Sequence, residues 1–253
     1  MLTKNINFRN FKDKKKNKKI NNLLIKLLKE KNSILASLTS SYKDSFSKKN
    51  LKKFKKYSNI TIIGMGGSIL GAKSIYNFLK KKIKKNFTFK DDFNFEKKNP
   101  KKNLNVIISK SGNTLETIVN SNTIINNLGS NIFITENKKS YLYSLAKKLK
   151  DEIIYHNNYI GGRFSVLSEV GMLPAELMGL NINKFRRLNY LIKDKRFLNS
   201  LVLNVSNILN LVNKGKTNSI ILNYDTGSSD LFYWYQQLVA ESLGKKGKGI
   251  FPI

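Results

Sequence analysis

Short apolar runs alternate with longer amphipathic stretches along much of this chain. The apolar runs are bounded by turn-forming residues and predict β-strands at residues 59–64, 104–109, 131–135 and 152–155. The stretches between them have helical spacing, at residues 68–82, 114–127 and 138–150. Strands that alternate with helices of this length are typical of βαβ units. The predicted fold class is therefore α/β, with a doubly wound parallel sheet flanked by helices.

Helical patterns also lie on both sides of this core. In a predicted helix at residues 20–31, Leu23, Leu24, Leu27 and Leu28 recur at helical spacing and indicate a packing face. After Gly161, helices are predicted at residues 168–179, 185–193 and 197–212. A strand at 219–223 and a helix at 229–242 then resemble the start of another α/β unit. Because one strand cannot form a sheet, this strand must join the first sheet or belong to a domain whose remainder is absent.

The composition narrows the possible chemistry. The 253 residues include no cysteine and a single histidine, His156, which argues against a structural zinc ion, a His-centred metal site or a disulfide. We expect no metal and no organic cofactor. His156 follows a predicted strand, where we expect a packing or capping role. The N-terminus has no apolar core of signal-peptide length and no apolar run is long enough to span a membrane, so we expect a cytoplasmic protein with no membrane partner.

The net charge of +31 has two interpretations. Such a charge is typical of proteins that bind nucleic acid or an anionic surface. The lysines, however, occur in runs along much of the chain, at residues 14–19, 80–85, 97–102 and 245–248, without the interleaved aromatic residues of RNA-binding patterns. We favour solvated faces and no specific nucleic-acid partner, and a basic nucleic-acid-binding protein remains an alternative.

A glycine-rich segment follows the first predicted strand. Gly64, Gly66 and Gly67 allow the backbone to approach a ligand, and Ser68 can cap the next helix or donate its hydroxyl to an anion. A strand-to-helix turn of this kind directs backbone N–H groups and a helix N-terminus toward an anion. The spacing matches neither a Walker loop nor the dinucleotide fingerprint. By itself the segment fits a tight structural turn equally well.

A second polar turn follows the next predicted strand. It contains Ser109, Lys110, Ser111, Asn113 and Thr114. Glu116 comes next, near the predicted helix start, where its charge suits the helix dipole. Ligands of doubly wound sheets bind outside the carboxyl ends of the strands, so both turns should face one pocket. The alternative is that Ser111 and Thr114 only cap the helix.

Four ordered motifs resemble the glucose-6-phosphate isomerase family. They are Gly64-Met65-Gly66-Gly67-Ser68, Ser109-Lys110-Ser111 with Thr114-Leu115-Glu116-Thr117, Gly161-Gly162-Arg163-Phe164-Ser165, and Gln236-Gln237-Leu238-Val239-Ala240-Glu241-Ser242. They span the chain from about residue 59 to its C-terminal end. The resemblance implies two sugar-isomerase (SIS) domains and the interconversion of glucose 6-phosphate and fructose 6-phosphate through a cis-enediol, without a cofactor.

The resemblance also implies a role for each matching residue. The sugar phosphate would be held by Gly67, Ser68, Ser109, Lys110, Ser111 and Thr114. Arg163 would stabilise the enediolate, and Glu241 would move a proton between C1 and C2. Gln237 lies one helical turn before Glu241 and would share its face. Taken singly, Arg163 could instead form an ordinary salt bridge and Glu241 could be a solvated helix residue.

The chain also departs from the family pattern. The family has a ring-opening histidine downstream of the glutamate, which the partner subunit of a homodimer supplies, and a lysine near its C-terminus. Neither residue has a counterpart here, and His156 lies too early in the chain to be that histidine. We therefore expect the N-terminal portion of such an isomerase, with weak sugar-phosphate binding and little turnover. Its predicted parts are a basic helical extension (1–50), a first SIS-type domain (51–195) and the truncated start of a second (196–253). A non-catalytic sugar-phosphate-binding SIS module or regulator is the alternative.

Overall fold

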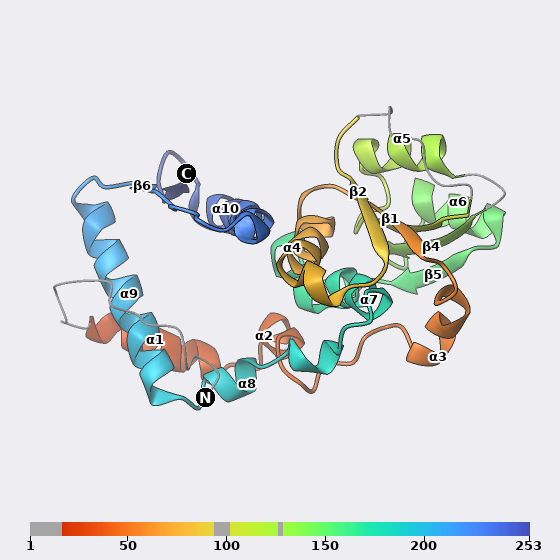
Figure 1. Ribbon diagram of the computed structural model, residues 1–253. Coiled ribbons are helices and arrows are strands. Elements are labelled where there is room, and N and C mark those ends of the chain that lie inside the picture. Colours follow the sequence, from red (N-terminus) through yellow and green to blue (C-terminus); the bar gives the residue numbers. More distant parts are fainter. Residues whose placement is uncertain (1–16, 94–101, 126–128) are drawn as a thin grey trace. The chain divides into compact units, whose positions relative to one another are not determined.

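The computed structural model describes residues 17–93, 102–125 and 129–253 (Figure 1). Two compact units make up the chain. One unit, the sheet unit, consists of Lys43–Phe185 and Leu222–Leu238. The other, the helical unit, consists of Met1–Tyr42, Arg186–Ile221 and Val239–Ile253.

The sheet unit is built on five parallel strands in the order β2-β1-β3-β4-β5. The strands are β1 (Asn59–Ile63), β2 (Asn86–Lys90), β3 (Leu104–Ile108), β4 (Ser130–Thr135) and β5 (Glu152–Tyr155). The four predicted strands are confirmed, as is the parallel α/β fold. The sequence did not predict β2, an edge strand in which Phe87 and Lys90 are buried while the other three residues are exposed or half-buried.

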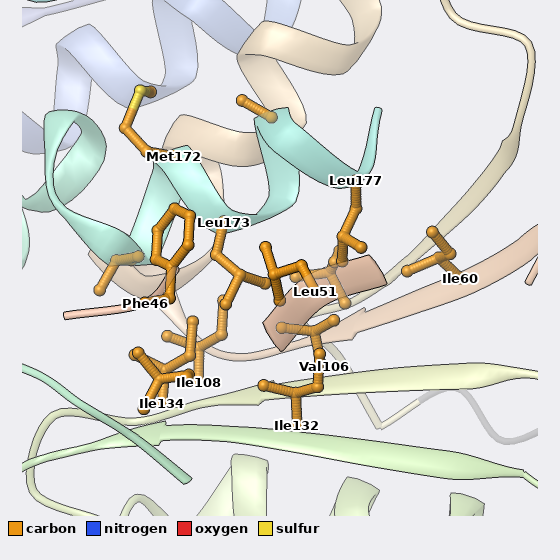
Figure 2. Packing of buried hydrophobic residues seen from close by; sticks show 14 of the residues in the cluster. Phe46, Leu51, Ile60, Val106, Ile108, Ile132, Ile134, Met172, Leu173 and Leu177 are labelled. Carbon is orange, nitrogen blue, oxygen red and sulfur yellow. The ribbon is translucent and has the colours of Figure 1, made fainter. Parts of the chain in front are cut away.

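Strand residues alternate between two hydrophobic clusters, one on each face of the sheet. Ile60 and Ile62 belong to the larger cluster and Ile63 to the smaller, as the period of two in a strand requires. Figure 2 shows the larger cluster, where Leu173 and Leu177 lie over Val106 and other strand residues. Burial on both faces explains why these strands read as nearly continuous apolar runs.

Helices cover both faces of the sheet, which confirms the doubly wound arrangement. They are α3 (Lys48–Leu51), α4 (Leu70–Leu79), α5 (Leu115–Ile124), α6 (Tyr141–Leu149) and α7 (Glu169–Leu177). The residues of a further helix, α10 (Ser229–Leu243), are divided between the two units. Leu142 and Ala146 of α6 pack in the smaller cluster, and α7 packs in the larger. The end of the helix predicted at 114–127 and the lysines at 14–16 and 97–101 lie outside the described residues.

A buried ladder of amide side chains crosses the sheet near the amino ends of its strands. Asn103 Nδ2 donates to Thr61 Oγ1 (2.8 Å) and to Asn105 Oδ1 (2.7 Å). Asn105 Nδ2 donates to Asn131 Oδ1 (2.9 Å), and Asn131 Nδ2 donates to Asp151 Oδ2 (2.8 Å). Burial raises the pKa of the Asp151 carboxyl, although its hydrogen bonds with Asn131 oppose this change.

Replacing Asp151 with asparagine should make stability less dependent on pH. The carboxyl holds its proton more tightly in the folded than in the unfolded chain, so its ionisation lowers stability as the pH rises above 3.8, the ordinary pKa. Asparagine can still accept from Asn131 Nδ2 and does not ionise. We expect a gain under about 1 kcal/mol at pH 7, because the carboxylate is only partly removed from water. Urea unfolding between pH 3.5 and pH 7 measures it, and a gain that is the same at every pH would contradict the explanation.

The helical unit contains four helices and a small parallel sheet among the residues described. Its elements are α1 (Lys18–Lys29), α2 (Ser33–Ser37), α8 (Leu188–Leu191), α9 (Lys195–Asn213), β6 (Asn218–Ser219) and β7 (Phe251–Pro252). The predicted strand at 219–223 therefore joins neither the first sheet nor a long partner. Only its first residue belongs to a strand, because β6 pairs with β7 in parallel at two positions, and beyond them Ile221 N donates to Ile253 O (2.8 Å).

Two predictions for this unit were only partly right. Leu24 and Leu28 of α1 are half-buried, whereas the side chains of Leu23 and Leu27 are exposed, so the packing face is narrower than predicted. The helix predicted at 185–193 shortens to the single turn of α8.

In the ranges that the structure covers, every helix is too short or too polar to cross a membrane.

Candidate functional site

Both predicted polar turns lie side by side at the carboxyl edge of the sheet. Strand β1 ends at Ile63 and β3 at Ile108, and the two strands are direct neighbours in the parallel sheet. A Cβ atom added to Gly64 would lie 3.0 Å from the carbonyl oxygen of Ile108. The turns after these strands therefore start from adjacent points, as predicted.

The first turn is tighter than the sequence predicted. A 3₁₀ turn, Gly66–Ser68, precedes α4, and Gly66 has φ +53°, a conformation that favours glycine. The N-cap position of α4 is occupied by Ile69. The prediction that Ser68 caps this helix is therefore wrong, because the 3₁₀ turn moves the helix start two residues along the chain.

Hydrogen bonds within the second turn fix its shape. The hydroxyls of Ser109 and Thr114 are 2.9 Å apart, and Ser111 Oγ accepts from Asn113 N (3.2 Å). Gly112 has φ +67°, and a Cβ atom there would lie 2.1 Å from Ser140 Oγ. The turn is thus packed closely against the start of α6. Two of its predicted phosphate ligands, Ser109 and Thr114, point toward each other.

The helices that follow these two turns lack side-chain caps. No side chain makes a capping hydrogen bond at the start of α4 or α5, although Thr114 occupies the N-cap position of α5. By contrast, Ser140 caps α6 and Ser168 caps α7. The interpretation of Ser111 and Thr114 as helix caps is therefore wrong. First-turn N–H groups without a cap are left for water or an anion.

Lys110 reaches along the edge of the sheet toward β5. Its Nζ donates to the carbonyl oxygen of Asn158 (2.5 Å) and lies 3.6 Å from Glu136 Oε1. The ammonium group is therefore held at the carboxyl edge by groups from two neighbouring loops. Glu116 lies in the first turn of α5, as predicted.

The Gly161-Gly162-Arg163 motif lies directly against the first turn. A Cβ atom on Gly67 would be 2.5 Å from the carbonyl carbon and oxygen of Gly162, so only glycine permits this approach of two backbones. Ser165 Oγ donates to Gly67 O (3.0 Å) and strengthens the contact. Two motifs about a hundred residues apart are thereby joined.

Arg163 belongs to the 3₁₀ helix Gly162–Leu167. Its guanidinium carbon lies 5.4 Å from the centre of the Phe164 ring, close enough for a cation–π interaction. The side chain is partly buried.

A buried pair supports the loop before Arg163. His156 Nδ1 lies 2.5 Å from Glu169 Oε1, and its Nε2 lies 3.0 Å from Ile160 O. Asn157 N also donates to Glu169 Oε1 (3.2 Å), so this carboxylate ties the loop after β5 to the start of α7. His156 has the packing role that its strand-end position predicted. The role of Glu169 was missed, since a single glutamate before an apolar helix carries no distinguishing pattern.

Gln237 and Glu241 lie one turn apart on α10, as predicted. Within the sheet unit, Gln237 lies beside Gly66, where an added Cβ atom would be 2.6 Å from Gln237 Nε2. Glu241 lies in the part of α10 that belongs to the helical unit.

The first turn of α10 is attached to α4 through Asp230. Ser74 Oγ donates to Asp230 O (2.7 Å), and Asn77 Nδ2 donates to Asp230 Oδ2. Lys73 Nζ lies 3.9 Å from Asp230 Oδ1 and 3.1 Å from Asp91 Oδ2. Sequence reasoning missed this attachment because it did not identify β2, after which Asp91 lies. It holds the helix that carries Gln237.

The five-stranded parallel sheet, flanked by helices and with glycine and hydroxyl turns at its carboxyl edge, places this chain in the class of SIS-like α/β proteins. The phosphoglucose isomerase family model matches residues 28–249, and the chain belongs to this family. Among curated proteins, it is 36% identical over 234 residues to a glucose-6-phosphate isomerase of Methanocaldococcus jannaschii, a match that covers 84% of this chain and 58% of that protein. The chain thus spans little more than half the length of this relative.

Solved structures show the same fold. A hypothetical protein from Thermus thermophilus superposes with a TM-score of 0.70 at 24% identity, covering 93% of this chain and 63% of the other. A glucose-6-phosphate isomerase from Chlamydia trachomatis has a TM-score of 0.62 at 21% identity, covering 86% and 50%. At these identities the structural likeness concerns the fold alone.

Proposed function

We propose that this chain carries the phosphate-binding turns and proton-transfer residues of an aldose-ketose isomerase that interconverts glucose 6-phosphate and fructose 6-phosphate. Ser68, Ser109, Lys110, Ser111 and Thr114 hold the phosphate, with the backbone at Gly67. The single observation that carries the proposal is the contact of Gly67 with Gly162. It brings the first phosphate turn against the loop of Arg163.

The proposed chemistry needs a base and a fixed cation. Glu241 takes the proton from C2 of the open-chain aldose, and the electron pair of that C–H bond forms the C1–C2 double bond while the carbonyl electrons move to O1. Arg163 stabilises the resulting enediolate, since a guanidinium remains protonated. The O2–H proton then moves to O1, and return of the abstracted proton to C1, while the O2 electron pair forms the C2 carbonyl, gives the ketose. Gln237, one turn before Glu241, binds a sugar hydroxyl.

Three features support the assignment. Motifs from distant parts of the sequence meet at Gly64, Gly66 and Gly67. Helices α4 and α5 start at this edge without side-chain caps, which suits an anion. Family membership and the named relative make a sugar phosphate the substrate class that fits these turns.

Binding of fructose 6-phosphate tests the proposed phosphate site. In calorimetry, Thr114→Ala is expected to weaken binding about tenfold, since it removes a hydrogen bond to a charged group. Thr123→Ala is the matched control, because Thr123 lies on the same helix with its hydroxyl bonded to Val119 O. Unphosphorylated fructose should not bind. Equal losses in both variants, or equal binding of fructose, would contradict the assignment.

A further inference from the structure

A cavity of about 480 Å³ lies within the sheet unit, away from the phosphate turns. Its lining residues are Lys48, Lys55, Lys85, Glu176, Leu177, Gly179, Leu180 and Asn181. The volume falls in the range of small-molecule sites, roughly 300 to 1,000 Å³. Three of the lining side chains are lysines and only one is a carboxylate, so the cavity has an excess of positive charge.

This cavity lies at the opposite edge of the sheet from the proposed sugar-phosphate site. Lys55 precedes β1 by a few residues, Lys85 directly precedes β2, and Glu176 is in the last turn of α7. In a parallel sheet the amino ends of the strands share one edge, and the phosphate turns follow the carboxyl ends. A ligand here would not compete with substrate.

The charges around the cavity are held by a nearly buried carboxylate. Glu176, with 9% of its side chain exposed, lies 3.4 Å from Lys48 Nζ through Oε2 and 4.0 Å from Lys55 Nζ through Oε1. Lys85 Nζ donates to the carbonyl oxygen of Lys55 (3.0 Å). Burial, and then the charge of Lys55, lower the pKa of Lys85. One carboxylate therefore does not balance the three ammonium groups, and a bound anion would.

Leu180 adds an apolar surface to this lining. It is half-buried and follows Gly179, whose φ of +82° ends α7 in a left-handed turn, whereas Leu177 is buried in the larger cluster. Inorganic ions need no such surface, whereas an organic molecule gains by covering it. We propose that this cavity binds a small organic anion with at least two negative charges and an apolar body, at a site separate from the sugar-phosphate site.

Pyridoxal 5′-phosphate is a suitable probe of this cavity. It has a phosphate group and an aromatic ring. Its aldehyde condenses with an unprotonated lysine, with loss of water, to form an imine. Borohydride then reduces this imine to a stable amine. With the full chain and peptide mapping, Lys85 is expected to be labelled about tenfold faster than the exposed Lys148, because it combines a bound phosphate with a lowered pKa. Pyrophosphate should protect Lys85. Equal labelling of both lysines, or no protection, would overturn the proposal.

Variants separate a specific site from general basicity. Lys55→Ala should weaken pyridoxal 5′-phosphate binding, measured by equilibrium dialysis, by roughly fivefold to tenfold. Lys148→Ala removes the same charge from α6 and should have no effect. Circular dichroism confirms that both variants are folded. Equal losses in the two variants would overturn the proposal. Protection of Lys85 by RNA but not by pyrophosphate would also overturn it and would assign the surface to nucleic acid.

Discussion

Replacing Glu241 with glutamine is expected to abolish exchange of the C1 proton of fructose 6-phosphate with solvent, while phosphate binding stays nearly intact. The amide keeps the shape of the side chain but cannot accept a proton. A positioned general base contributes about a hundredfold to ten-thousandfold to a rate, so the loss should be at least of this order. Phosphate binding is assigned in our proposal to the turns after β1 and β3, so it should not change.

Proton NMR in D₂O measures this exchange directly, and calorimetry measures the binding. Glu152→Gln is the matched control, because Glu152 forms a surface ion pair with Lys53 at the start of β5. Full exchange in the Glu241→Gln variant would reject Glu241 as the base. If a chain completed with the missing family residues binds the sugar phosphate but catalyses no exchange, the non-catalytic SIS module is the better description.

Replacing Gly67 with alanine should destabilise the sheet unit and weaken sugar-phosphate binding together. The new methyl group would lie 2.5 Å from backbone atoms of Gly162, so one of the two loops must move. Overpacking of this kind costs roughly 1 to 3 kcal/mol. The shift would also move the Arg163 loop away from the first phosphate turn. Urea unfolding and calorimetry with fructose 6-phosphate measure the two effects.

Gly162→Ala is the control from the other side of the same contact. A Cβ atom on Gly162 would be 3.5 Å from the Gly67 Cα, an ordinary contact, and Gly162 is solvent-exposed. This variant should therefore remain within about 0.5 kcal/mol of the unaltered chain. If both variants lose equal stability, the close backbone approach is not the cause.

The parts of the fold that the sequence predicted are those where one local pattern decides the structure. Strands β1, β3 and β4 were identified because their apolar runs are buried on both faces, and β5 because of its short apolar run, although Tyr155 is exposed. Strand β2 was missed because it is an edge strand between lysines, with Asn86, Thr88 and Lys90 among its residues. Its position depends on pairing with β1, which no local pattern encodes.

The parts of the candidate site and the closeness of its two polar turns were predicted, but the contacts that join these turns to other loops were not. The glycine and hydroxyl turns, and the spacing of Gln237 and Glu241, follow from residue types and helical period. The contact of Gly67 with Gly162 and the pairing of His156 with Glu169 depend on tertiary packing. The start of α4 was misplaced because the 3₁₀ turn at Gly66 is set by this packing rather than by a capping side chain.

The amide ladder bears on how the sheet assembles. Its apolar strands resemble one another in composition, so the hydrophobic effect alone discriminates weakly between alternative strand orders. Asn105 lies beside Asn131, and Asn131 beside Asp151, because β4 lies between β3 and β5 in the sheet. Each amide buried without its partner would cost about 1 to 3 kcal/mol. Sheets in which β4 does not lie between β3 and β5 should therefore be less stable than the native sheet, and the ladder should select against them during folding.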